Sequence, residues 1–148
     1  MNKVFQLIII LFFIIRCSAP TPINYDEELT EINGIYYLKN TNKVYSGKFF
    51  TLFRDGVKKN EGTLKDGKLN GVYTFWYESG EKKGEVSFKN GKENGRNTLW
   101  YRNGQKLEEG IYNDGKRYGK RVFWNSNGTK KKEVNYNKDG RPHGIAIK

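Results

Sequence analysis

The sequence predicts an all-β protein: a single-layer twisted antiparallel meander of tandem β-hairpin repeats, each about 24 residues long, preceded by an N-terminal signal helix. Three observations predict this fold class. Glycine recurs at a constant step of 24 residues at Gly47, Gly71, Gly95 and Gly119. Aromatic residues, which favour strands, make up 15% of the chain. Asp-Gly and Asn-Gly pairs, typical of tight hairpin turns, recur in phase with the glycines.

Length, charge and cysteine content limit what the chain can be. At 148 residues it has room for one domain. Its formal net charge of +11 would attract an acidic protein, anionic lipid or nucleic acid without distinguishing among them. Its one cysteine, Cys17, excludes an intrachain disulfide.

Residues 1–16 are predicted to be a signal peptide. Lys3 supplies a positive start, and residues 4–15 form an almost uninterrupted apolar run, shorter than the ~20 residues that a membrane-spanning helix needs. Cys17 follows the run directly, and this arrangement resembles a bacterial lipoprotein signal. The resemblance implies that Cys17 carries a lipid and anchors the mature chain to a membrane of the cell envelope.

Two alternatives to lipidation stay open. Arg16 stands where a lipoprotein signal normally has a small residue, and Cys17 and Ala19 are spaced as in an ordinary signal cleavage site. The chain would then be secreted or periplasmic. An uncleaved anchor is the other alternative, and all three predict export.

Residues 17–33 are predicted to be a tether. Pro20 and Pro22 interrupt regular structure, and an acidic cluster follows at residues 26–31, with no apolar period. The folded domain is therefore expected to span residues 34–148.

The repeat divides this domain into units 47–70, 71–94, 95–118 and 119–143, followed by a short closing strand. Several columns of residues recur in phase with the leading glycines, which is the signature of a repeat architecture. The columns are Leu52, Trp76, Trp100 and Trp124; Glu61, Glu85, Glu109 and Glu133; Lys58, Lys82, Lys106 and Lys130; and Leu64, Phe88, Tyr112 and Tyr136. The last step, to Gly144, is one residue longer, and the extra residue is assigned to the loop at Lys138 and Asp139.

Each unit is expected to be a hairpin whose turn sets the register. The pairs Asp55-Gly56, Asn103-Gly104 and Asn127-Gly128 suit the two positive φ angles of a type I′ turn. With these turns as pivots, each leading glycine lies opposite the column that begins with Leu64, and we expect a ring to lie flat across the glycine backbone. The Trp and Glu columns then share one face of the sheet. The other face carries Phe75, Leu99 and Phe123 together with Tyr77 and Tyr101.

The unit from Gly71 to Lys92, with its Phe-Trp-Tyr run, Gly80, the Lys82-Lys83 pair and Asn90-Gly91, is repeated from Gly95 to Lys116. It resembles the MORN repeat variant found in tandem in bacterial proteins, and residues 34–47 resemble the segment that commonly precedes the first full unit. The resemblance implies an antiparallel repeat sheet that binds a protein or lipid. Proteins of this type are often labelled antitoxins.

We expect no catalytic site, metal or cofactor. His143 is the only histidine and follows Pro142 near the C-terminus, without a second histidine to share a metal. The four Glu residues recur once per hairpin, which spaces them regularly instead of bringing two together on one bond. Lysine pairing explains them more simply.

The predicted partner contacts are Trp76, Tyr77, Trp100, Tyr101 and Trp124, because a single sheet without helices leaves some of its rings accessible. Burial in a core is the competing interpretation of the tryptophans. Export argues against the alternative of single-stranded nucleic acid. The sequence thus predicts a protein-binding module or scaffold at the bacterial envelope, with an antitoxin or immunity-type protein as the alternative and a structural or membrane-associating protein after that. It identifies neither the partner nor the oligomeric state.

Overall fold

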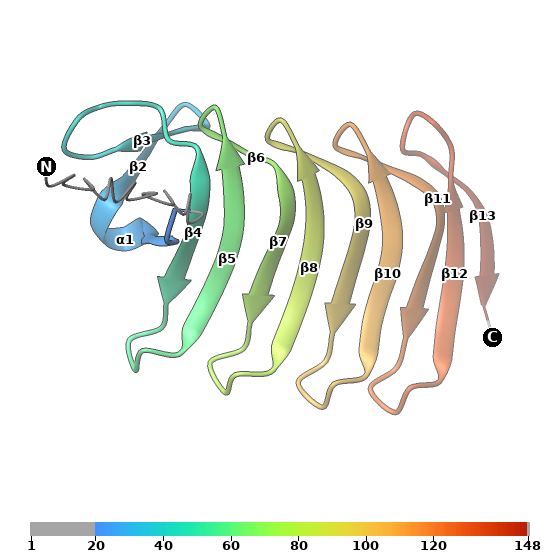
Figure 1. The fold of residues 1–148 in the computed structure, drawn as a ribbon. Helices are drawn as coiled ribbons and strands as arrows, with labels where there is room; N and C mark the ends of the chain where they lie inside the picture. The colour runs from blue at the N-terminus through green and yellow to red at the C-terminus, as the bar shows by residue number, and fades with distance from the viewer. Residues whose placement is uncertain (1–19, 148) are drawn as a thin grey trace, which may run out of the picture.

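The computed structural model describes residues 20–147, most of which form one large open sheet (Figure 1). This sheet has 11 strands, and a second, two-stranded sheet lies at its N-terminal end. The elements are β1 (Ile23–Asn24), α1 (Tyr25–Glu28), β2 (Leu29–Ile32), β3 (Ile35–Leu38), β4 (Gly47–Leu52), β5 (Lys58–Lys65), β6 (Lys68–Leu69), β7 (Gly71–Trp76), β8 (Lys82–Lys89), β9 (Lys92–Trp100), β10 (Lys106–Asn113), β11 (Lys116–Trp124), β12 (Lys130–Tyr136) and β13 (Pro142–Ile147).

From β4 onward, strands that follow one another in sequence also lie side by side, as in a meander, except that β6 and β7 both pair with β5. Their pairing is antiparallel throughout, and β1 alone pairs in parallel, with β4. The prediction of a β-rich, antiparallel, hairpin-linked sheet is confirmed. The signal helix predicted for residues 1–16, and Cys17, lie outside the described residues.

The predicted register within each hairpin is also confirmed. Each leading glycine pairs with the residue of the column that begins with Leu64. The four pairs are Gly47 with Leu64, Gly71 with Phe88, Gly95 with Tyr112, and Gly119 with Tyr136.

The turn type predicted for Asp55-Gly56 and its equivalents is wrong. Gly56 has a φ of 86°, but Asp55 does not have a positive φ. The N–H of Phe53 donates to the carbonyl of Val57 at 2.7 Å, and the N–H of Gly56 donates to the carbonyl of Phe53 at 3.0 Å. This is a three-residue loop, a type I turn followed by a bulge glycine. The Asp55 carboxylate accepts a hydrogen bond from the Val57 N–H at 3.1 Å, which stabilises the loop without a positive φ.

Two consecutive positive φ angles occur instead at the opposite end of the strands. Asn90 and Gly91 have φ angles of 52° and 80°, between the paired residues Lys89 and Lys92, so they form a two-residue turn of the I′ kind. Asp66-Gly67 and Asp114-Gly115 repeat this geometry. The last connection at this end, between β12 and β13, is again a three-residue loop, which accommodates the extra residue as predicted.

Three of the four leading glycines are needed for their backbone conformation and not to accommodate a ring, whereas a Cβ on Gly47 would meet the ring of Tyr45. Gly71, Gly95 and Gly119 have φ angles of 107°, 107° and 65°, and a Cβ added to Gly71 or Gly119 would meet no atom within 4 Å. They lie where strand pairing shifts register, for instance between the Val86–Asn97 and Phe88–Glu93 pairs. The expectation that a ring of the opposite column lies across these glycines is therefore wrong. Rings lie against other glycines instead: Gly84 lies beneath Phe75, and Gly62 lies against Phe49 and Tyr73.

The residues predicted to form a tether instead fold against the sheet where the structure describes them. Residues 20–33 contain β1, α1 and β2, and the Leu29 side chain is only 1% exposed. Leu29, Phe49 and Leu64 form the apolar core, and Ile23 and Tyr25 pack against it. Burial of these side chains outweighs the proline and acidic content that suggested a tether. We call residues 20–45 the N-terminal cap.

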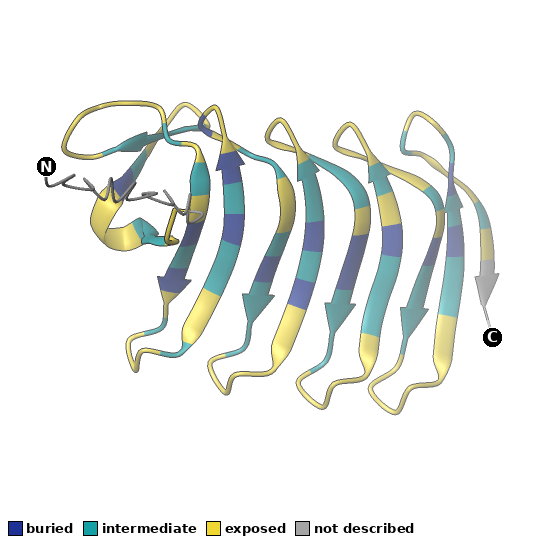
Figure 2. Ribbon diagram, viewed as in Figure 1, coloured by how far each residue is buried: buried dark blue, intermediate teal, exposed yellow. Residues whose placement is uncertain are grey.

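Burial varies regularly along the strands (Figure 2), with buried residues near their centres and exposed residues in the turns. Apart from the N-terminal cap, the described residues form no second layer over the sheet. Both faces beyond the cap therefore depend on side chains of the sheet itself for cover.

Candidate functional site: the Trp-Lys-Glu face

One face of the sheet carries a motif that recurs from hairpin to hairpin. The Lys82 ammonium lies 2.5 Å from a carboxylate oxygen of Glu85 and 5.7 Å from the ring centroid of Trp100 in the next hairpin. The same arrangement recurs along the sheet. We call this surface the Trp-Lys-Glu face, and it consists of Trp76, Trp100, Trp124, Lys58, Lys82, Lys106, Lys130, Glu61, Glu85, Glu109 and Glu133.

Strand geometry explains why these residues meet. Trp76 pairs with Lys82 and Thr74 pairs with Glu85 across the β7–β8 hairpin. Residues two apart on a strand point to the same side, so Trp76 and Thr74 share a face. Gly84 would direct a Cβ toward Phe75 and Leu99, and its neighbour Glu85 therefore points the other way. The geometry agrees with the expected separation of the Trp and Glu columns from the Phe75 column.

The tryptophans are half-buried between lysine side chains. Lys58 and Lys106 lie 5.4 and 5.6 Å from the ring centroids of Trp76 and Trp124, within the range of cation–π attraction. Because the rings are neither fully buried nor fully exposed, they contribute both to the packing of the sheet and to its accessible surface.

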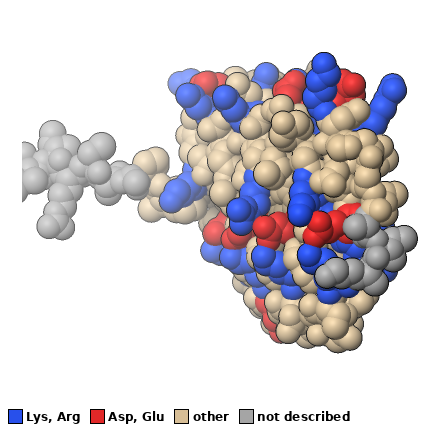
Figure 3. Space-filling view, turned by 90° about the vertical axis from the view of Figure 1, so that its right-hand side faces the viewer, with Lys and Arg blue, Asp and Glu red and all other residues tan. Residues whose placement is uncertain are grey.

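Charged side chains are segregated into bands on this face. Seen from the end of the sheet at which β13 lies, the molecule shows a band of acidic side chains with Lys and Arg side chains above and below it (Figure 3). On one side are the lysines of the motif. On the other side Arg96 approaches Glu109 at 3.5 Å and Lys120 approaches Glu133 at 3.0 Å.

Two lysines contact Glu133, the last glutamate of the face. Lys130 and Lys120 contact its two carboxylate oxygens at 2.6 and 3.0 Å. Hydrogen bonds from these two lysines, first from Lys130, lower the pKa of Glu133 to about 2. The carboxylate is therefore ionised at any physiological pH.

The two tyrosines predicted as partner contacts have a structural role. The Tyr77 hydroxyl donates to the Trp100 carbonyl at 2.8 Å, and the Tyr101 hydroxyl donates to the Trp124 carbonyl at 2.9 Å. Each tyrosine therefore ties its own hairpin to the next one. The first and last units have Phe53 and Asn125 in this place. Of the five predicted contacts, the structure brings the three tryptophans into one row and uses both tyrosines as cross-links.

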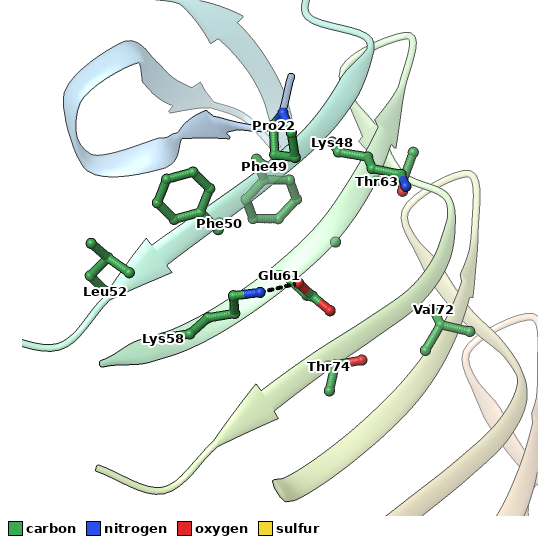
Figure 4. Close-up of a pocket in the computed structure, with 11 residues that line it drawn as sticks. Pro22, Lys48, Phe49, Phe50, Leu52, Lys58, Glu61, Thr63, Val72 and Thr74 are labelled. Atoms are coloured by element: carbon green, nitrogen blue, oxygen red, sulfur yellow. Dashed lines mark hydrogen bonds and ion pairs between the residues drawn. The ribbon is translucent and has the colours of Figure 1, made fainter. Parts of the chain in front are cut away.

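A groove of about 570 Å³ opens at the N-terminal end of the same face (Figure 4). Its apolar wall comes from Phe50, Leu52 and Val72, and the last two side chains are 37% and 54% exposed. The lining also includes Pro22, Lys48, Phe49, Lys58, Glu61, Gly62, Thr63 and Thr74. This groove was not predicted from the sequence, although one residue pointed to it. Leu52 stands in the Trp column, and its side chain is smaller than the indole that the other three units have at this position.

The remaining chemistry of the described residues is sparse. Within residues 20–147 no three His, Cys, Asp or Glu side chains lie close enough together to hold a metal ion, and His143 is exposed. That same part of the chain has no helix with the length and apolar content needed to cross a membrane. The predicted lipidation site, Cys17, falls outside it.

Comparison of the chain with protein-family models, with curated proteins and with solved structures gave no match.

Proposed function

We propose that this chain is a MORN-type repeat protein that binds a protein partner through its Trp-Lys-Glu face. The observation that carries the proposal is the row of tryptophans. All three tryptophans of the chain lie half-buried in one line, on a face where the N-terminal cap does not cover them. Accessible tryptophans are the residues most enriched among the energetic anchors of protein interfaces.

The finer description of the fold belongs to the same proposal. The recurrence of register, turn type and ion pair every 24 residues supports a single-layer sheet of tandem MORN-type units, with the N-terminal cap in place of a free tether. We place the protein at the bacterial envelope, exported by residues 1–16 and anchored by a lipid on Cys17. Its role there is to bind a protein rather than to catalyse a reaction.

Charge supports an acidic partner. The net charge is +11, and in each of the four Lys–Glu pairs of the face the lysine side chain is more exposed than the glutamate. An approaching partner therefore meets ammonium groups before carboxylates. Electrostatic complementarity of this kind mainly accelerates association and selects among partners.

Affinity capture from a lysate of the source cells tests the proposal. Trp100→Leu is the informative variant, because Leu52 already occupies the equivalent position in the first unit. We expect it to reduce capture of the main partner about tenfold or more while the far-ultraviolet circular dichroism stays unchanged. The matched control, Ile145→Ser, changes an exposed apolar residue on the opposite face and should capture normally. Ile145 and Arg121 both pair with Val134, and Arg121 lies two residues from Phe123 on its strand. Equal capture by wild type and Trp100→Leu would refute the proposed binding face.

A further inference from the structure

We propose that the partner presents an extended, proline-rich, acidic segment in polyproline II conformation, which lies along the Trp row and crosses the strands. One residue in three of that segment packs against a tryptophan. This inference rests on the proposed function and adds the chemistry and conformation of the partner.

The spacing of the Trp row carries the inference. Trp76, Trp100 and Trp124 end strands β7, β9 and β11, which are two strands apart in the sheet order. Adjacent strands are ~4.8 Å apart, so successive tryptophans are ~9.6 Å apart. One turn of a polyproline II helix contains three residues and advances ~9.3 Å, and every third side chain faces the same way.

Other regular conformations fit this spacing less well. In a β-strand, side chains on one face recur every ~6.7 Å, which does not match the row. Residues seven apart on an α-helix face the same way and are ~10.5 Å apart, so the error of ~0.9 Å per step grows to ~2.7 Å from Leu52 to Trp124. The polyproline II error is ~0.3 Å per step and stays near 0.9 Å over the same three steps.

The surroundings of the rings suit proline. Each indole is half-buried, and a lysine ammonium lies 5.4 to 5.7 Å from its ring centroid, so each ring offers a ligand a partly exposed apolar surface next to a positive charge. Rows of aromatic rings bind polyproline II segments because the ligand is already ordered and loses little conformational entropy.

The charges beside the row favour acidic residues at the positions that do not face a tryptophan. The Lys82 and Lys106 ammonium groups lie 5.7 and 5.6 Å from the ring centroids of Trp100 and Trp124. These lysine side chains are 45% and 47% exposed, whereas their partners Glu85 and Glu109 are 38% and 26% exposed. Lys48 is exposed beside the groove at the end of the row. The cations are thus within reach of a ligand along the row.

The groove gives the ligand a direction. Leu52 continues the Trp row by one more step, and its small side chain opens the groove between Phe50 and Val72. A bulky apolar residue at one end of the bound segment would fill this groove, while prolines contact the three tryptophans.

Synthetic peptides test the inference, with the fluorescence of the three tryptophans as the readout. The main probe has about four Pro-Pro-Glu units and spans ~37 Å when extended. We expect it to change the fluorescence saturably. Matched Gly-Gly-Glu and Pro-Pro-Lys peptides should bind about tenfold more weakly, because the first is not preordered and the second is repelled. Trp100→Leu should weaken the main probe about tenfold, and Ile145→Ser, on the opposite face, should leave its binding unchanged.

The end groove is tested by adding Phe to either end of the Pro-Pro-Glu probe. One of the two extended peptides should bind about fivefold more tightly than the parent peptide. Leu52→Trp, which gives the first unit the residue of the other three, should fill the groove and remove that gain. If the two extended peptides bind wild type equally well, and Leu52→Trp binds them as wild type does, the ligand has no preferred direction on the sheet and this part of the proposal is wrong.

Two results would overturn the inference as a whole. One is no fluorescence response to Pro-Pro-Glu at millimolar concentration. The other is tighter binding of an acidic helical peptide with Leu at every seventh residue. If either result occurs while capture of the natural partner still depends on Trp100, the polyproline conformation is wrong and the proposed binding face stands. If capture does not depend on Trp100, the proposed function itself fails.

Discussion

The two ends of the sheet build their interiors from different side chains, although they share one repeat. Phe49, Tyr73, Asn97 and Arg121 occupy the same position in four successive hairpins. At the N-terminal end Phe49 is 5% exposed and belongs to an apolar core with Leu29 from the N-terminal cap. Toward the C-terminal end Asn97 and Arg121 are 6% and 1% exposed, and both are polar.

A covering element explains the difference. The N-terminal cap supplies Tyr25 and Tyr36, whose ring centroids lie 6.1 and 6.4 Å from that of Phe49. Arg121 has no such cover among the described residues. Its guanidinium lies 4.8 Å from the Tyr112 ring centroid, forms an ion pair with Glu108 and occupies the space beside Gly110 that a Cβ would need. A long side chain lying along the sheet thus takes the place of a second layer, and its burial lowers the pKa of Arg121.

The largest effect is expected at the covered end. Leu29→Ala removes a side chain that is 1% exposed and leaves a cavity against Phe49 and Leu64. We expect the free energy of unfolding in urea to fall by about 3 to 4 kcal/mol. A loss below about 1 kcal/mol would show that the N-terminal cap is not part of the cooperative core.

The second prediction concerns the buried ion pair at the uncovered end. Glu108→Leu leaves the Arg121 guanidinium buried without its partner and should cost about 2 kcal/mol, since the Glu108 side chain is still 17% exposed. Adding Arg121→Leu should restore most of this loss, because apolar replacement of a buried pair is often neutral. A double variant less stable than Glu108→Leu alone would contradict the account of how this end is packed.

The third prediction tests the cross-link between hairpins. Tyr101→Phe removes the hydroxyl that donates to the Trp124 carbonyl and should lower stability by about 1 kcal/mol. Amide hydrogen exchange should rise mainly in β11 and β12, because the stability of a stack of hairpins depends on nearest-neighbour contacts. Uniform acceleration across all strands would argue against such local coupling.

The smallest effect on stability is expected from the charge of Glu133, near the C-terminal end of the sheet. The folded-state pKa of Glu133 is lowered from 4.5 to about 2, so its contribution to stability is present above pH 4.5 and is lost as the pH falls through 2. Glu133→Gln should therefore flatten the decline of stability between about pH 5 and pH 2. An NMR titration of Glu133 should show its pKa rising in Lys120→Met, and an unchanged pKa would contradict the assigned cause.

The hairpin register was predictable from sequence because it depends only on the number of residues between each column and the turn. Counting outward from the turn places each leading glycine opposite Leu64 or its equivalent, and the structure has this pairing. The separation of Trp76 from Phe75 follows from the two-residue alternation of a strand.

The turn types were not predictable in the same way, because both ends of the strands carry Asp-Gly or Asn-Gly pairs. Asp55-Gly56 and Asp66-Gly67 are the same dipeptide, yet only Asp66 has a positive φ. The number of residues between the last paired positions decides the turn type: Lys65 pairs with Lys68 around a two-residue turn, whereas Leu52 pairs with Lys58 around a longer loop. The register determines this number, and the dipeptide alone does not.

The packing of residues 20–33 and the groove were missed because both depend on contacts between segments that are distant in sequence. Ile23, Tyr25 and Leu29 have no apolar period of their own, and their partners Phe49 and Leu64 lie in the first hairpin. The groove likewise forms where Leu52 stands in place of the tryptophan that the other three units have in this column.

Site-specific photocrosslinking tests the central claim most directly. A benzoylphenylalanine at position 100 lies in the Trp row, whereas the same residue at position 123 lies on the opposite face, where Phe123 packs beside Lys132. We predict that irradiation in the source cells joins a protein partner to position 100 and not to position 123. Crosslinking from position 123 without crosslinking from position 100 would contradict the account and place the binding surface on the other side of the sheet.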